Sequence, residues 1–155
     1  NAKKTKVERG FLSEKELKSL EEVPLPANLS IVRDVFIFAV YTGLSYVDIE
    51  NLTNENINVG IDKSLWLSYY RQKTDIHAIL PLLQPAVNIL KRYEAYHEGK
   101  RNNHIFPVPL NQVMNRYLKK VAKQAGVDKN ITFHCARHIE LPLSLNLNRL
   151  QRLVS

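Results

Sequence analysis

A short run near the end of the chain combines two histidines with an arginine: His134-Cys135-Ala136-Arg137-His138. On a helix, His134 and Arg137 are three residues apart and therefore share one face. A guanidinium can hold two oxygens of a phosphate at once, and histidine can gain or release a proton near neutral pH. These residue types could bind an oxyanion and move a proton, and His138, four residues after His134, lies on the same face.

Other interpretations of this run are open. His134 and His138 could bind a metal, but the chain has no H-E-x-x-H motif and no third ligand at an obvious spacing, so we expect no metal and no cofactor. Cys135 could act as a thiol nucleophile, but adjacent helical residues face apart. Arg137 alone could be an ordinary surface charge, and Lys73 alone a solvated turn residue.

The bulk composition fits one domain with a basic surface. The 155 residues contain 22 Lys and Arg against 15 Asp and Glu, a formal net charge of +7. This surplus favours a polyanionic partner, although charge alone leaves a soluble basic domain equally open. One cysteine excludes an internal disulfide and suits a reducing compartment. No apolar run reaches the roughly 20 residues that a membrane span needs, so we expect no membrane partner.

Helices are predicted through the first third of the chain. Ser13 with Glu16 three residues later forms a capping box, which starts the first helix. A second segment is apolar on more than one face, which predicts a buried helix, and Gly43 ends it. The helices expected here cover residues 13–22, 29–41 and 45–52.

The middle of the chain changes to strand-like sequence and then returns to helices. Alternating apolar residues, separated by polar turns at 62–64 and 72–75, predict three antiparallel strands. Asn111 is expected to cap a helix that Gly126 ends, and Thr132 to cap the helix that carries the histidines. The strands are expected at 57–61, 65–70 and 77–82, and the later helices at 86–96, 111–125 and 132–138. This order predicts an α+β fold, mainly helical, in which helices pack with a small three-stranded antiparallel sheet.

Three sequence boxes resemble those of the tyrosine recombinases, the phage-type integrase family. Residues 41–48, Y-T-G-L-S-Y-V-D, resemble the family's first active-site box, commonly T-G-L-R-x-x-E/D-L. Residues 71–74, R-Q-K-T, resemble its β-hairpin with a catalytic lysine, and residues 133–138, F-H-C-A-R-H, resemble its H-x-x-R-H box. The boxes follow the family's order within a resemblance that covers roughly residues 8–138. Their details are most similar to integrases of mobile elements in the Bacteroides group.

The resemblance implies site-specific recombination or integration of double-stranded DNA, by transesterification at a phosphodiester. Arg137 would clamp the phosphate, His134 would donate to a phosphate oxygen or act as acid or base, and His138 would support the site. Lys73 would protonate the leaving 5′ oxygen, and Asp48 would orient a cationic ligand. The resemblance also implies other recombinase protomers as partners, in a tetramer on DNA, and a cytoplasmic, nucleoid-associated location.

The chain departs from the family pattern at two functional positions. Ser45 stands where most members have the first arginine, and a neutral hydroxyl cannot replace a guanidinium, so Lys73 or an unidentified residue would have to supply the charge. No tyrosine follows Tyr117, so no candidate for the nucleophilic tyrosine is present. We therefore expect a linker at 1–10 that follows a missing N-terminal DNA-clamping domain, an incomplete catalytic domain at 11–138 and an atypical tail at 139–155.

The tail has leucines with a period of two around Pro142, which does not continue a helix. A shifted reading frame through residues 150–155 could encode Ala-Thr-Val-Ser-Lys, which resembles the family's sequence, so we expect a frameshift. As it stands, the chain is expected to be an inactive fragment of a DNA strand-exchange enzyme. The alternatives are a non-catalytic DNA-binding module, such as a decayed integrase, and an unrelated helical interaction domain.

Overall fold

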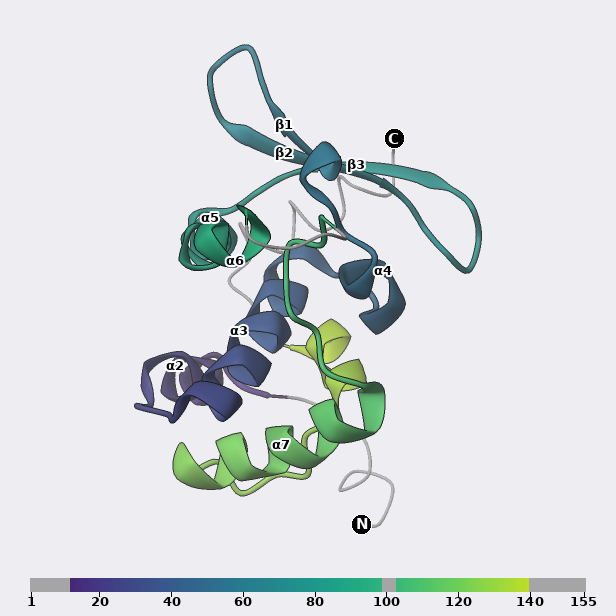
Figure 1. Cartoon of the computed structure of the whole chain (residues 1–155). Coiled ribbons are helices and arrows are strands. Elements are labelled where there is room, and N and C mark those ends of the chain that lie inside the picture. The colour runs from purple at the N-terminus through teal and green to yellow at the C-terminus, as the bar shows by residue number, and fades with distance from the viewer. Residues whose placement is uncertain (1–11, 99–102, 140–155) are drawn as a thin grey trace.

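The computed structural model describes residues 12–98 and 103–139. The linker expected at 1–10 and the tail from residue 140 lie outside the described residues. A long central helix, α3, has other helices around it and the sheet beyond one end (Figure 1). The elements are α2 (Glu14–Glu22), α3 (Ala27–Thr42), α4 (Tyr46–Glu50), the 3₁₀ helix η1 (Asn54–Asn56), β1 (Ile57–Val59), β2 (Leu65–Tyr70), β3 (His77–Pro81), α5 (Gln84–Arg92), α6 (Glu94–Glu98), α7 (Asn111–Gln124) and the 3₁₀ helix η2 (Phe133–His138). The predicted helices with a small antiparallel sheet are therefore confirmed.

Helix α2 begins where the capping box predicts. The Glu16 amide donates to Ser13 Oγ at 3.1 Å, and the Ser13 amide donates to the Glu16 carboxylate at 3.0 Å. Two of the amides that a helix start leaves unpaired are thereby satisfied. Leu17 and Leu20 are buried in the core, so this short helix is held by one apolar stripe.

Helix α3 is buried on more than one face, as its composition predicts. Phe36 and Phe38, two positions apart and so on different faces, are 1% and 0% exposed. Gly43 ends the helix with a φ of 76°, and its amide donates to the Ala39 carbonyl at 2.7 Å. This left-handed conformation is strained for a residue with a Cβ, which explains the glycine there.

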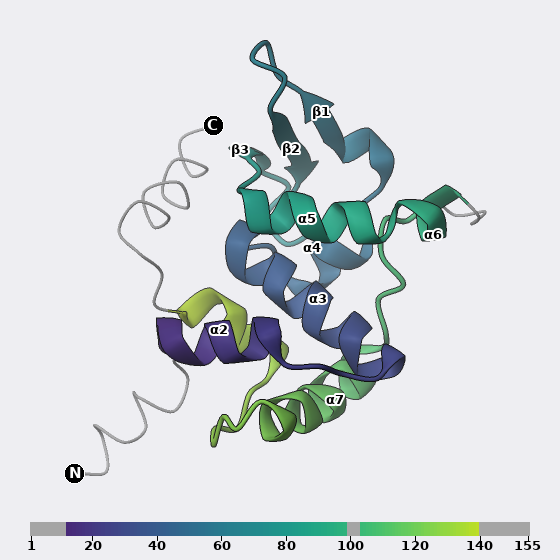
Figure 2. The ribbon, with the colours of Figure 1, turned by 90° about the vertical axis from the view of Figure 1, so that its left-hand side faces the viewer.

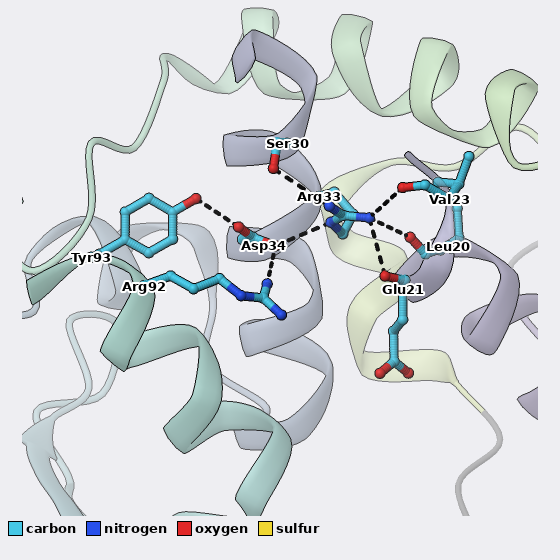
Figure 3. A network of polar contacts seen from close by, with 8 residues as sticks. All are labelled: Leu20, Glu21, Val23, Ser30, Arg33, Asp34, Arg92 and Tyr93. Carbon is cyan, nitrogen blue, oxygen red and sulfur yellow. Dashed lines mark hydrogen bonds and ion pairs between the residues drawn. The ribbon is translucent and has the colours of Figure 1, made fainter. Parts of the chain in front are cut away.

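Arg33 on α3 holds the C-terminal end of α2 (Figure 3). Its Nη1 donates to the carbonyl oxygens of Leu20, Glu21 and Val23 at 3.1, 3.2 and 3.0 Å. These carbonyls carry the partial negative charge of a helix end and have lost their partners within the helix. One guanidinium therefore closes α2 and fixes it against α3.

The next residue, Asp34, connects α3 to α5. It is 3% exposed, and its carboxylate accepts from Arg33 Nε at 3.1 Å, from Arg92 Nη1 at 2.8 Å and from the Tyr93 hydroxyl at 2.8 Å (Figure 3). Burial, together with the Asp34 hydrogen bond, raises the pKa of Tyr93, so this phenol stays protonated and donates. A buried carboxylate here is matched by two cations and one neutral donor.

The three strands pair in the order β1-β2-β3, antiparallel throughout, as predicted. Ile57 pairs with Leu67, and Tyr70 pairs with His77, which sets the register of the two hairpins. Figure 2 shows α5 crossing α3 below the sheet. The hairpin of β2 and β3 closes with the Arg71 amide donating to the Ile76 carbonyl at 2.9 Å.

Several element bounds differ from the predictions: α3 begins at Ala27 rather than at residue 29, α4 ends at Glu50 rather than at residue 52, and β1 ends at Val59 rather than at residue 61. The single helix expected over 86–96 is divided at Tyr93, whose backbone leaves helical geometry while its ring packs edge-on against Phe106 and its hydroxyl reaches Asp34. Tertiary contacts therefore override the local pattern. Asn111 does not cap α7; extended backbone continues through Leu110, so Asn111 is already the first helical residue and makes no side-chain cap.

The end of α7 and the segment that follows complete the fold. Gly126, with a φ of 75°, ends α7 as predicted, and the Val127 amide donates to the Ala122 carbonyl at 2.9 Å. The segment predicted as a helix from Thr132 is the 3₁₀ helix η2, which extended Ile139 follows directly. Ile139 is buried and bridges to Leu12 in parallel.

Candidate functional site

A groove of about 750 Å³ brings together residues from all three sequence boxes. It lies among the start of α4, the turn between β2 and β3, the start of α7 and the 3₁₀ helix η2. The groove contains five of the residues singled out from the sequence, whereas His138 is not in its lining. The lining residues are Leu44, Ser45, Tyr46, Val47, Asp48, Arg71, Gln72, Lys73, Thr74, Asn111, Asn115, Thr132, Phe133, His134 and Arg137.

The α4 side of the groove is organised by Asp48. Its Oδ2 accepts from the Ser45 hydroxyl at 3.0 Å, and its Oδ1 accepts from the backbone amide of Gln72 at 2.9 Å. Asp48 is 8% exposed, so these hydrogen bonds replace most of its contact with water. Asp48 thereby ties α4 to the backbone of the β2–β3 turn.

The hairpin side carries two cations. Lys73 lies at the turn and is exposed, whereas Arg71 lies at the end of β2 and is half-buried. The Asp48 contact with Gln72 falls between them, so both side chains leave from backbone that is fixed to α4. Arg71 was not among the site residues predicted from the sequence; its place two residues before Lys73 in the same box was the available signal.

The η2 side presents His134 and Arg137. Residues three apart nearly eclipse each other in a 3₁₀ helix, so these two exposed side chains leave on the same side. The predicted pairing on one face thus survives the change of helix type. The His138 ring lies against that of His134, with centroids 5.2 Å apart.

The 3₁₀ helix is anchored by its first residue, Phe133. The Phe133 amide donates to Asn115 Oδ1 on α7 at 2.8 Å, and its ring packs edge-on against Tyr46 on α4 at 5.7 Å. Cys135 is buried and is not part of the groove lining; its Sγ accepts from the Thr132 amide at 3.4 Å. Packing on the core side therefore sets where His134 and Arg137 stand.

Tyr46 also lines the groove, and its hydroxyl donates to the Pro109 carbonyl. Burial and the neighbouring Glu50 carboxylate raise the pKa of Tyr46 to about 12. The phenol therefore stays protonated near neutral pH, and its hydrogen bond to Pro109 links α4 to the segment before α7. An attacking phenolate would need the opposite shift.

The charges of the groove favour an anion. Its lining holds the cations Arg71, Lys73 and Arg137, and one carboxylate, Asp48. Within residues 12–98 and 103–139, no three His, Cys, Asp or Glu side chains are grouped as metal ligands. Among the helices of the same ranges, none is long and apolar enough to cross a bilayer.

A model of the phage integrase family matches residues 10–148. The chain belongs to this family. The match covers all three boxes and extends past His138. No curated protein matches the chain.

Solved recombinase structures share the fold. The XerH site-specific recombinase, in a pre-cleavage complex with its difH substrate, superposes with a TM-score of 0.65 at 17% identity, covering 83% of this chain and 40% of XerH. The XerA recombinase gives a TM-score of 0.64 at 24% identity, covering 83% of this chain and 46% of XerA. The chain thus spans less than half the length of either protein, and at these identities the likeness concerns the fold.

Proposed function

We propose that the chain is part of the catalytic domain of a site-specific tyrosine recombinase, and that its groove holds one phosphodiester of double-stranded DNA. One observation carries the proposal: boxes at 41–48, 71–74 and 133–138, far apart in the chain, line a single groove. Three cations around one carboxylate favour a phosphate there. Family membership and the XerH complex with difH support DNA as the source of that phosphate.

Each groove residue has a role in this proposal. Arg137 binds the non-bridging oxygens with its guanidinium, and His134, three residues earlier, donates to a phosphate oxygen or moves a proton. Lys73, at the exposed turn, protonates the 5′ oxygen as a tyrosine oxygen attacks phosphorus and the phosphorus–oxygen bond breaks. We assign no residue of the chain as this nucleophile.

The proposal extends to the setting in which the domain works. We propose that other recombinase protomers assemble with it as a tetramer on DNA, and that it acts at the bacterial nucleoid. The serine at position 45 and the details of the boxes support a relationship with mobile-element integrases of the Bacteroides group.

Duplex binding tests the proposal directly. A fluorescein-labelled duplex titrated with the chain at several salt concentrations should show affinity that falls steeply as salt rises. Arg137→Ala should weaken binding about tenfold and reduce the salt slope by about one, because a charged hydrogen bond and one phosphate contact are lost. Lys123→Ala is the control: Lys123 is exposed near the far end of α7 and does not line the groove. Salt-independent binding, or equal losses in the two variants, would contradict the proposal.

A non-catalytic DNA-binding module is the second candidate, favoured by Ser45, whose neutral hydroxyl stands where the family's first active-site box commonly has an arginine. The two candidates differ in covalent chemistry. A protein extended through the natural C-terminus of its gene should form a covalent adduct with a nicked suicide duplex if the enzyme function holds. Duplex binding without any adduct would favour the non-catalytic module.

A further inference from the structure

The groove contains a position that supplies no charge. Ser45 lines it, but the Ser45 hydroxyl donates its one proton to Asp48 Oδ2 at 3.0 Å and accepts from the Asp48 amide at 3.3 Å. The side chain is therefore occupied in capping α4 and holding Asp48. A ligand in the groove receives neither a free donor nor a positive charge from position 45.

Arg71 lines the same groove and stands on fixed backbone. Its amide donates to the Ile76 carbonyl at 2.9 Å, and its carbonyl accepts from the Asp75 amide at 2.7 Å. The neighbouring residue is held in turn by the contact between the Gln72 amide and Asp48. Both peptide groups of Arg71 are thus fixed at the strand end. Because the backbone is already ordered, Arg71 loses less conformational entropy when its guanidinium binds an anion.

The guanidinium of Arg71 has no counterion among the described residues. Its side chain is half-buried, and it makes no hydrogen bond or ion pair with any residue in 12–98 or 103–139. By contrast, Arg33 and Arg92 are both paired with Asp34. A partly desolvated arginine without a counterion costs stability, and that cost is offset when an anion binds.

We propose that Arg71 is a phosphate-binding residue of the groove and supplies, together with Arg137, the guanidinium charge that position 45 lacks. This inference rests on the proposed function. Two arginines from separate elements then hold the phosphate oxygens, and arginine suits this because its planar fork meets two oxygens at once. Lys73, on the exposed turn two residues later, is left to transfer a proton.

Charge removal and relocation test the inference in the same duplex-binding assay. Arg71→Ala should weaken binding about tenfold and lower the salt slope by about one. Arg71→Lys should keep the slope but recover only part of the affinity, because the charge remains and the fork is lost. Adding Ser45→Arg to Arg71→Ala should restore slope and affinity, because position 45 opens into the same groove. Lys123→Ala, on α7 roughly 18 Å along the helix from Asn111, is the control and should match the wild type.

Thermal unfolding separates a binding role from a structural one. Arg71→Ala should keep the wild-type Tm or raise it, because the variant loses an uncompensated charge and no side-chain hydrogen bond or ion pair within the described residues. A lowered Tm, or binding equal to that of Lys123→Ala, would each overturn the inference while leaving the proposed function standing. If the wild-type chain itself binds without salt dependence, the proposed function fails first.

Discussion

Two buried carboxylates on neighbouring helices are satisfied in opposite ways. Asp34, 3% exposed, is neutralised by Arg33 and Arg92. Asp48, 8% exposed, accepts only from the neutral donors Ser45 and Gln72, and no cation of the described residues lies in ion-pair range. In the first arrangement, ion pairs neutralise the positive charges of Arg33 and Arg92, and the Arg92 pair joins α3 to α5.

The second arrangement joins elements without consuming charge. Because Asp48 is satisfied by an amide and a hydroxyl, the cations that line the same groove are not drawn onto it. A structural carboxylate can therefore lie beside an anion-binding groove. The ion pairs of Asp34 stabilise the packing of the helices, whereas the neutral contacts of Asp48 leave the cations of the groove available for a ligand. The same substitution, Asp to Asn, should therefore change the free energy of unfolding by different amounts at positions 34 and 48.

Asp34→Asn should produce the largest effect. It removes the negative charge but leaves Arg33, whose side chain is 13% exposed, without its counterion, so unfolding should become easier by about 3 kcal/mol. Urea unfolding at neutral pH measures this. Arg92→Met is the matched control and should cost less than about 1 kcal/mol, because the Arg92 side chain is 56% exposed and its pair is largely solvated. Equal costs for the two variants would show that charge burial at Asp34 is not what matters.

At Asp48, the same change to Asn should be tolerated, whereas loss of the acceptor should not. Asn keeps an oxygen for the Gln72 amide, so Asp48→Asn should cost less than about 1 kcal/mol; Asp48→Ala leaves the amide unpaired and should cost about 2 kcal/mol. Hydrogen exchange at Gln72 should accelerate in the Ala variant only. If Asn proves as harmful as Ala, Asp48 acts through its charge, and the contrast with Asp34 is lost.

Local signals in the sequence predicted the elements, and long-range contacts decided what it could not predict. The Ser13 capping box, the burial of α3 and the stop at Gly43 depend on residues a few positions apart, and all were confirmed. The break at Tyr93 depends on Asp34, 59 residues away, which no local pattern encodes.

Several residues of the site could also be predicted from the sequence, whereas their long-range contacts could not. Motif resemblance singled out Ser45, Lys73 and Arg137, which meet in one groove. The partner of Asp48, however, is the backbone amide of a residue 24 positions away. Every residue except proline has such an amide, so residue types do not reveal this contact. Arg71 was passed over although it lies two residues before Lys73 in the same box; that its side chain makes no ion pair within the described residues is visible only in the packed structure.

Glu16 provides the smallest test, on an ion pair at the surface. Its carboxylate contacts Lys129 Nζ at 2.8 Å, with side chains 26% and 30% exposed. Burial acts to raise the pKa of Glu16, but the hydrogen bond and charge of Lys129, with the Ser13 contacts, outweigh it and lower the pKa overall. Stability from this pair is therefore present above the unfolded pKa of Glu, about 4.3, and is lost as pH falls through the lower folded value.

Glu16→Gln isolates that ionic contribution, because glutamine can still complete the capping box with Ser13. The variant should cost less than about 1 kcal/mol at pH 7, as expected for a largely solvated pair, and the difference from wild type should vanish near pH 3. Urea midpoints at the two pH values measure this. A stability difference that persists at pH 3 would mean that glutamine disturbs the capping box itself. A loss of stability at pH 7 as large as that of Asp34→Asn would mean that the exposure of an ion pair does not determine how much it stabilises this protein.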